Sequence, residues 1–213
     1  RRLDGTWKFR LYERPEAVPE EAMLPATGDG DWSDIEVPGN WNMQGWDRPH
    51  YTNVQMPFAN LPPDVPEQNP TGVYRTRFDL PAAWKGRRVV LHFGGVESVL
   101  FLHVNGRFVG LSKGTRVPAE FDITEALQPG GNLIAAKVVR WSDASFVEDQ
   151  DHWWNAGIYR EVYVTATDSV WIADLFARGD YDPVTRAGSL ALTVSLGFAA
   201  QPEAAHTVEA RLY

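Results

Sequence analysis

Short runs in which apolar and polar residues alternate, separated by turn residues, constrain this chain more than any other feature. Such runs are typical of half-buried β-strands. They recur through residues 3–167, many of them 8 to 14 residues apart, and no long amphipathic helix interrupts them. Asn105-Gly106 lies between two apolar runs and predicts a hairpin, because a type I′ turn needs positive φ at both central residues. The sequence therefore predicts an antiparallel β-sandwich or jelly roll.

The individual elements follow from the same pattern. We expect strands at residues 3–13, 72–80, 87–96, 99–104, 107–111, 132–141 and 158–167. Asp122 is expected to cap one short helical turn. The Pro- and Glu-rich residues 14–31 predict a loop or one short helix, and residues 35–58 predict an ordered loop with short strands.

The pattern changes after Ser169. The sequence predicts one strand, a turn around residues 180–183, a strand at residues 189–196 and a last strand at residues 207–213. Two or three strands of a sandwich cannot bury a full core. We therefore expect this part to begin a second domain that continues past residue 213.

Charge and composition exclude several classes of function. A net charge of −8 and the lack of a Lys/Arg run count against binding to nucleic acids or anionic membranes. No stretch approaches the ~20 apolar residues of a membrane span. The chain has no cysteine, which excludes disulfides, thiolate metal sites and thiol nucleophiles and fits a reducing cytoplasm. We expect a cytoplasmic protein that binds neither nucleic acid nor membrane.

The most unusual segment is EDQDHWW, residues 148–154, with three carboxylates in four positions beside a histidine and two tryptophans. Carboxylates on a loop can bind a hard cation or accept hydrogen bonds from sugar hydroxyls, and an indole can stack on a pyranose ring. The alternative is a solvated acidic loop beside buried tryptophans. A complete pair of catalytic carboxylates is not expected here, because such pairs usually come from different elements.

Other motifs carry less information. The chain has no phosphate-binding GxxxxGK[ST] loop, no GxSxG elbow and no HExxH zinc motif. Asn69 begins the tetrapeptide NPTG just before a strand. An asparagine at such a place is more often part of an Asx turn than a ligand contact.

Four longer strings together resemble one enzyme family. They are VPGNWNMQGWDRPHYTNVQMPF, PPDVPEQNPTGVYRTRF, VNGRFVGLSKGTRVPAEFDIT and VVRWSDASFVEDQDHWWNAGIYREVYV. They resemble the N-terminal region of family 2 glycoside hydrolases, of the β-galactosidase type encoded in bacterial lactose operons. The resemblance extends over residues 3–213, nearly the whole chain.

The resemblance implies a domain organisation and an activity. Residues 1–166 would form a galactose-binding-like jelly roll, the sugar-binding domain, and residues 167–213 the incomplete start of an immunoglobulin-like β-sandwich. A TIM barrel later in the same chain would hold both catalytic glutamates, and the full-length protein would be a homo-oligomer. That enzyme would release terminal β-D-galactose from β-galactosides such as lactose by hydrolysis, with retention of configuration at the anomeric carbon. These 213 residues alone would be inactive.

The resemblance also implies roles for single residues. Asn69 would hydrogen-bond galactose, and Asp151 would bind both a galactose hydroxyl and a sodium ion (Na+) whose site the barrel completes. Magnesium (Mg2+) is expected in the full-length enzyme but not in this segment. Asp143 matches a position near a peripheral divalent-metal site.

Three further residues of the acidic segment are expected to have structural roles. Trp153 matches the tryptophan of the family motif and should pack in the core behind the loop. Glu148 and Asp149 should form structural pairs, for which Arg140 or Arg160 are the expected partners.

Two other interpretations remain open. A free-standing carbohydrate-binding module would use exposed aromatic residues as a platform and would need no barrel. A related family 2 enzyme, such as a β-glucuronidase or a β-mannosidase, would share the fold. The EDQD and NPTG motifs count against this last alternative.

Overall fold

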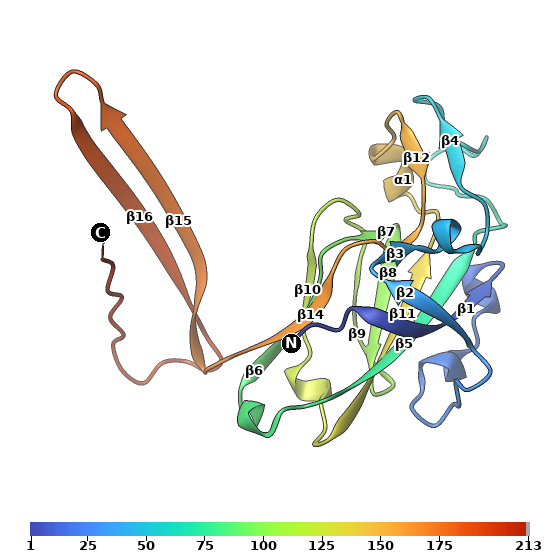
Figure 1. Ribbon diagram of the computed structural model, residues 1–213, viewed down its shortest axis with the longest axis horizontal. Coiled ribbons are helices and arrows are strands. Elements are labelled where there is room, and N and C mark those ends of the chain that lie inside the picture. Colours follow the sequence, from blue (N-terminus) through green and yellow to red (C-terminus); the bar gives the residue numbers. More distant parts are fainter. Residues whose placement is uncertain (212–213) are drawn as a thin grey trace. The chain divides into compact units, whose positions relative to one another are not determined.

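The computed structural model describes residues 1–211, which form an almost entirely β structure of antiparallel sheets (Figure 1). The residues group into two compact units. Unit 1 comprises residues 1–85 and 89–165, and unit 2 comprises residues 86–88 and the chain from residue 166 onward. The all-β antiparallel fold expected from the alternating runs is confirmed.

The largest sheet of unit 1 has six strands in the order β2-β1-β5-β11-β8-β9. The strands are Ser33–Val37 (β2), Gly5–Tyr12 (β1), Thr71–Asp79 (β5), Gly131–Val139 (β11), Val99–Val104 (β8) and Arg107–Ser112 (β9). The predicted hairpin joins β8 to β9, and both turn residues, Asn105 and Gly106, have positive φ. For most of these strands, the bounds predicted from the alternation of apolar and polar residues agree with the structure to within a few residues.

Smaller sheets complete unit 1. One has the order β10-β6-β14, with strands Ala119–Asp122 (β10), Arg88–Phe93 (β6) and Val162–Thr167 (β14). Another has the order β3-β13-β7, with strands Gly39–Asn40 (β3), Gly157–Ile158 (β13) and Val96–Glu97 (β7). The short strands β3 and His50–Thr52 (β4) lie in the segment that the sequence marked as an ordered loop.

An aromatic cluster lies between the six-stranded sheet and the β3-β13-β7 sheet. The rings of Phe9 and Tyr74 are 4.7 Å apart, and the ring of Trp41 lies 6.0 Å from Phe9. All three side chains are buried. Gly72 permits this contact, because a Cβ there would lie 2.6 Å from Phe9 and 2.8 Å from Trp41. The backbone N–H of Trp41 donates to the carbonyl of Ala156 and so fixes the chain just before β13.

The helices are short and lie between the strands. They are the 3₁₀ helices Pro15–Ala17 (η1), Glu20–Met23 (η2), Trp41–Gln44 (η3), Ala82–Trp84 (η4) and Thr124–Ala126 (η5), and the α-helix Ala144–Val147 (α1). The N-cap residue of η5 is Ile123, so the prediction that Asp122 is the cap is wrong by one residue, although its carboxylate accepts a hydrogen bond from the backbone N–H of Thr124. Among the described residues, no helix is long and apolar enough to cross a membrane.

One buried cation shapes the segment that carries η1 and η2. The guanidinium of Arg75 donates to the backbone carbonyls of Ala22, Leu24 and Thr27 and lies 3.2 Å from the carboxylate of Asp29. Burial lowers the pKa of Arg75. The guanidinium supplies hydrogen bonds to backbone carbonyls that lie outside the β-sheets. These bonds stabilise the irregular segment that carries η1 and η2.

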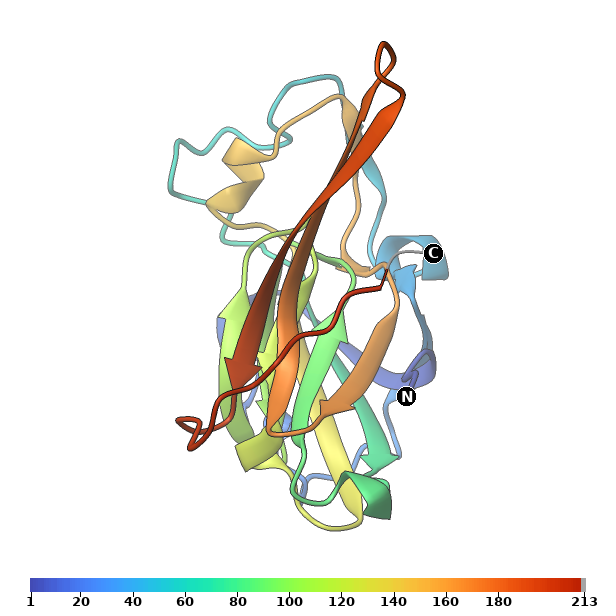
Figure 2. The same cartoon turned by 90° about the vertical axis from the view of Figure 1, so that its left-hand side faces the viewer.

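A two-stranded sheet projects at one end of unit 1. Strands His50–Thr52 (β4) and His152–Trp154 (β12) pair antiparallel, with Tyr51 opposite Trp153. Figure 1 and Figure 2 both show β4, β12 and α1 gathered at this end. The pair brings the EDQD segment beside residues about 100 positions earlier in the chain.

The regular structure of unit 2 after residue 169 is a long hairpin within the described residues. Strands Val170–Asp182 (β15) and Ala187–Phe198 (β16) pair along their length. The predicted last strand is wrong for residues 207–211, which have no regular structure, and residues 212–213 lie outside the described residues. The immunoglobulin-like assignment and the expected boundary after residue 166 stay predictions.

Candidate functional site

Asp151 lies at the exposed turn before β12. One oxygen of its carboxylate, Oδ1, accepts a hydrogen bond of 2.6 Å from the hydroxyl of Tyr51 on β4. This hydrogen bond raises the pKa of Tyr51 above its ordinary value, so the phenol stays protonated and donates. No hydrogen bond to the second oxygen, Oδ2, is present within residues 1–211. The structure thus orients the carboxylate and leaves Oδ2 available to accept hydrogen bonds.

The two tryptophans of the segment occupy opposite environments. Trp154 is 3% exposed, whereas Trp153 is 57% exposed. The prediction that Trp153 packs in the core is therefore wrong, because alternate residues of a strand point to opposite faces and Trp154 takes the inner one. The ring of Trp153 lies 5.4 Å from the ring of Tyr51. Tyr51, Asp151 and Trp153 together are called the tip cluster.

Below the tip cluster, the side chain of Arg140 is buried and joins two elements. It forms an ion pair with Asp47 and donates a hydrogen bond of 2.8 Å to the carbonyl of Trp154. Burial lowers the pKa of Arg140, and the charge of Asp47 opposes this shift. The prediction that Arg140 pairs with Glu148 or Asp149 is wrong, since Asp47 occupies that position.

Glu148 and Asp149 differ in their contacts. The carboxylate of Glu148 accepts hydrogen bonds from the backbone N–H and the hydroxyl of Thr115, in the loop after β9. The Oδ1 atom of Asp149 is buried and has no hydrogen-bond partner among the described residues. Arg160 lies over the ring of Tyr159, and among the described residues no ion pair joins it to Glu148 or Asp149, so this predicted pairing is wrong. Glu148 ties the acidic segment to the main body of unit 1.

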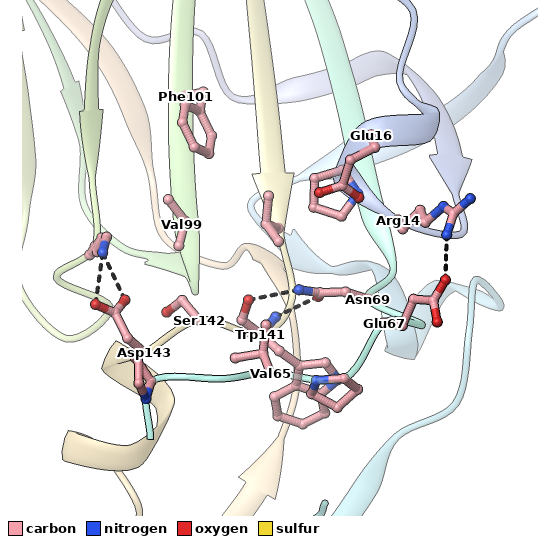
Figure 3. Close-up of a pocket in the computed structure, with 15 residues that line it drawn as sticks. Arg14, Glu16, Val65, Glu67, Asn69, Val99, Phe101, Trp141, Ser142 and Asp143 are labelled. Atoms are coloured by element: carbon pink, nitrogen blue, oxygen red, sulfur yellow. Dashed lines mark hydrogen bonds and ion pairs between the residues drawn. The ribbon is translucent and has the colours of Figure 1, made fainter. Parts of the chain in front are cut away.

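Asn69 is buried within the scaffold, at 4% exposure. Its amide accepts a hydrogen bond of 2.8 Å from the backbone N–H of Trp141 and donates one of 2.9 Å to the carbonyl of the same residue (Figure 3). These two bonds leave one N–H and one oxygen lone pair of the amide available. Asn69, Arg140, Trp141 and Trp154 together are called the base cluster.

A hollow of about 710 Å³ lies beside Asn69 and Trp141 (Figure 3). Val99, Phe101 and Val139 provide apolar walls, and charged side chains stand at its rim. On the rim, the ammonium of Lys113 lies 2.7 Å and 2.9 Å from the two carboxylate oxygens of Asp143.

The structure does not bring Asn69 and Asp151 into one pocket. Asn69 lines the hollow described above, whereas Asp151 does not. A chain of contacts joins them instead, because Asn69 holds Trp141 and the ring of Trp141 lies 5.5 Å from that of Trp154 on β12. The base cluster therefore supports the strand that carries the tip cluster.

A smaller hollow of about 240 Å³ borders the acidic segment, lined in part by Gln150, His152 and Trp153. It also contains Glu97, which is buried, and burial raises the pKa of this carboxyl group. A raised pKa is one property of a general acid. However, Arg116 lies 3.3 Å from both oxygens of Glu97, which makes a structural ion pair the simpler role.

Asp151 could supply one carboxylate ligand to a cation, but the residues around it do not form a complete cation site. A carboxylate oxygen suits a hard cation such as sodium, which takes several oxygen ligands. Within residues 1–211 no group of three or more histidine, aspartate and glutamate side chains could hold a metal ion. A cation at Asp151 would need further ligands from outside the described residues.

Sequence comparisons agree with the motifs. Residues 1–168 match the profile described as "Glycosyl hydrolases family 2, sugar binding domain". The chain is 44% identical over 211 residues to a β-galactosidase of Psychromonas ingrahamii, which covers 99% of this chain and 20% of that protein. A β-galactosidase of Vibrio cholerae gives the same identity and the same two coverages. The chain thus spans 20% of the length of these curated relatives.

Solved structures share the fold. A β-glucuronidase from an uncultured Clostridium species superposes with a TM-score of 0.70 at 24% identity, over 92% of this chain and 33% of that one. A Bifidobacterium dentium β-glucuronidase complexed with coumarin-3-O-glucuronide gives a TM-score of 0.68 at 22% identity, over 92% of this chain and 35% of that one. At these identities the likeness concerns the fold alone.

Proposed function

Because this chain belongs to glycoside hydrolase family 2, whose sugar-binding domain it matches over residues 1–168, we propose that it is the N-terminal, non-catalytic part of a retaining β-galactosidase. In this proposal it contributes loops to the galactose subsite of a longer protein. The catalytic glutamates belong to a barrel domain of the same longer chain, and the substrates are β-galactosides such as lactose.

The tip cluster is the observation that supports this proposal most strongly. Asp151 is exposed, oriented by Tyr51 and placed beside the exposed ring of Trp153. An ionised carboxylate accepts hydrogen bonds from sugar hydroxyls, and an indole face packs on the apolar face of a pyranose. Asp151 is also the residue that would hold a sodium ion, which when bound supplies a positive charge beside the carboxylate.

Asn69 has a more restricted part in the proposal. Two of its hydrogen-bonding positions are engaged by Trp141, so at most one N–H and one lone pair remain for a sugar hydroxyl. Its main contribution is to hold the base cluster in place. Direct contact with galactose would use only the remaining amide N–H or oxygen lone pair.

The other carboxylates near the tip cluster are poor candidates for catalysis. Retaining hydrolysis needs two carboxyl groups about 5 to 5.5 Å apart that flank the scissile bond. Glu148 is held by Thr115, and Glu97 is paired with Arg116. Neither is presented to a substrate, and we therefore assign both catalytic groups to the part of the protein outside this chain.

The test uses the longer protein with Asp151→Asn. We expect kcat/KM for a nitrophenyl β-galactoside to fall by about 100-fold, the size of effect seen when one oriented polar contact to a transition state is lost. Replacing sodium by a larger monovalent cation should slow the wild-type enzyme and leave the variant unchanged. Asp34→Asn is the control, since Asp34 is an exposed carboxylate paired with Lys8.

Two results would contradict the proposal. The first is a loss in Asp151→Asn no larger than in the control. The second is release of nitrophenol by the isolated 213 residues above a matched blank. Micromolar binding of galactose by the isolated chain in titration calorimetry would favour a free-standing carbohydrate-binding module instead, because an incomplete subsite should bind the free sugar weakly.

A further inference from the structure

The Lys113–Asp143 pair links two separate elements of unit 1. Lys113 follows β9 directly, and Asp143 is the N-cap residue of α1, where its Oδ1 also accepts from the backbone N–H of Ala144. The Lys113 ammonium lies within 2.9 Å of both carboxylate oxygens. The pair therefore joins the end of the large sheet to the helix that precedes the EDQD segment.

The ammonium contacts both carboxylate oxygens through which Asp143 could bind a metal ion. Resemblance places Asp143 near a peripheral divalent-metal site, yet both of its oxygens already contact a positive charge. A magnesium ion requires near-octahedral oxygen coordination, and within residues 1–211 no metal-ligating cluster includes Asp143. The residues present do not fit a divalent cation, since the metal would first have to displace Lys113.

We propose that the ammonium of Lys113 is the resident cation at Asp143, and that this chain joins β9 to α1 without a divalent metal ion. A lysine ammonium is a compact point charge with three donors, so it can bridge two carboxylate oxygens as a small cation does. Contact with Lys113 lowers the pKa of Asp143, so the carboxylate remains charged in the pair.

Neighbouring contacts explain why the connection matters to the acidic segment. Two residues after Lys113, Thr115 donates its backbone N–H to the carboxylate of Glu148, just after α1. Lys113 and Thr115 thus contact both ends of the α1 turn. A cation carried by the chain keeps this turn in place whatever the concentration of free metal ions.

The test combines metal titration and unfolding of the 213-residue chain. In wild-type protein we expect no selective Mn2+ broadening of the NMR signals of residues 143–147, and the same unfolding midpoint in magnesium chloride and in EDTA. Lys113→Met should lower the midpoint by about 1 to 3 °C, as for the loss of one partly exposed ion pair. It should also increase Mn2+ broadening near Asp143, because the competing charge is gone.

Lys8→Met is the matched control, since Lys8 also forms a partly exposed ion pair, of 2.7 Å, with Asp34. Its Mn2+ response near Asp143 should equal that of wild type. Selective broadening near Asp143 in wild type that disappears in Asp143→Asn would overturn the proposal. So would a midpoint in Lys113→Met equal to that of wild type, or equal Mn2+ broadening in wild type and Lys113→Met. Neither Mn2+ broadening nor the unfolding midpoint depends on sugar hydrolysis, so a failure of this proposal can be distinguished from a failure of the proposed function.

Discussion

The base cluster and the tip cluster are joined through β12 but are built in opposite ways. Asn69 and Arg140 in the base cluster are buried; the amide of Asn69 and one terminal nitrogen of Arg140 bind backbone groups, and the other terminal nitrogen of Arg140 binds the carboxylate of Asp47. Asp151 and Trp153 in the tip cluster are exposed. The comparison indicates a division of roles, in which the base cluster fixes β12 and the tip cluster presents polar and aromatic groups outward. Preorganisation of this kind limits the entropy lost when a ligand binds.

Removing the buried cation of the base cluster should have the largest effect. Arg140→Met leaves the carboxylate of Asp47 without its partner and the carbonyl of Trp154 without its donor. We expect the free energy of unfolding to fall by about 3 to 5 kcal/mol, the usual cost of breaking a buried ion pair on one side. Urea denaturation followed by tryptophan fluorescence measures this change.

Arg10→Met provides the control for Arg140→Met, because Arg10 pairs with Asp31 on the surface. Such an exposed pair contributes little to stability, because solvent screens the two charges. If both variants lost the same small amount, the base cluster would not be the rigid support described above.

Asn69→Ala should have the next largest effect. The substitution removes both hydrogen bonds between the Asn69 amide and Trp141. The buried backbone N–H and carbonyl of Trp141 then have no partner. We expect a loss of about 2 to 3 kcal/mol in the free energy of unfolding, measured by the same denaturation. Asn60→Ala is the control, since Asn60 is exposed and makes one long hydrogen bond of 3.3 Å to Val65. A change in Asn69→Ala as small as in the control would mean that the amide serves only a ligand.

The sequence predicts much of the fold because its signals are local. Alternation locates β5, β8 and β11, and Asn105-Gly106 locates the hairpin turn. The family motifs point to Asn69 and Asp151 as single residues. None of these inferences depends on which distant segments come together.

What the sequence misses in the site depends on contacts between distant segments. Strands β4 and β12 have three residues each, too few for alternation to be read. Tyr51 therefore carries no signal that it would bind Asp151, and Asp47 carries none that it would pair with Arg140. Trp153 and Trp154 are chemically identical, and only the pairing of β12 decides which of them is buried.

The smallest effect on stability should come from the tip cluster itself. Tyr51→Phe removes the hydrogen bond to Asp151 and keeps the aromatic ring beside Trp153. We expect the urea midpoint of unfolding to stay close to that of wild type, as for most surface substitutions. In the longer protein, a less ordered Asp151 should raise KM for a nitrophenyl β-galactoside a few-fold with little change in kcat, because substrate binding weakens. A loss of stability as large as that of Asn69→Ala would show that the tip cluster also supports the fold, and the division between the two clusters would be wrong.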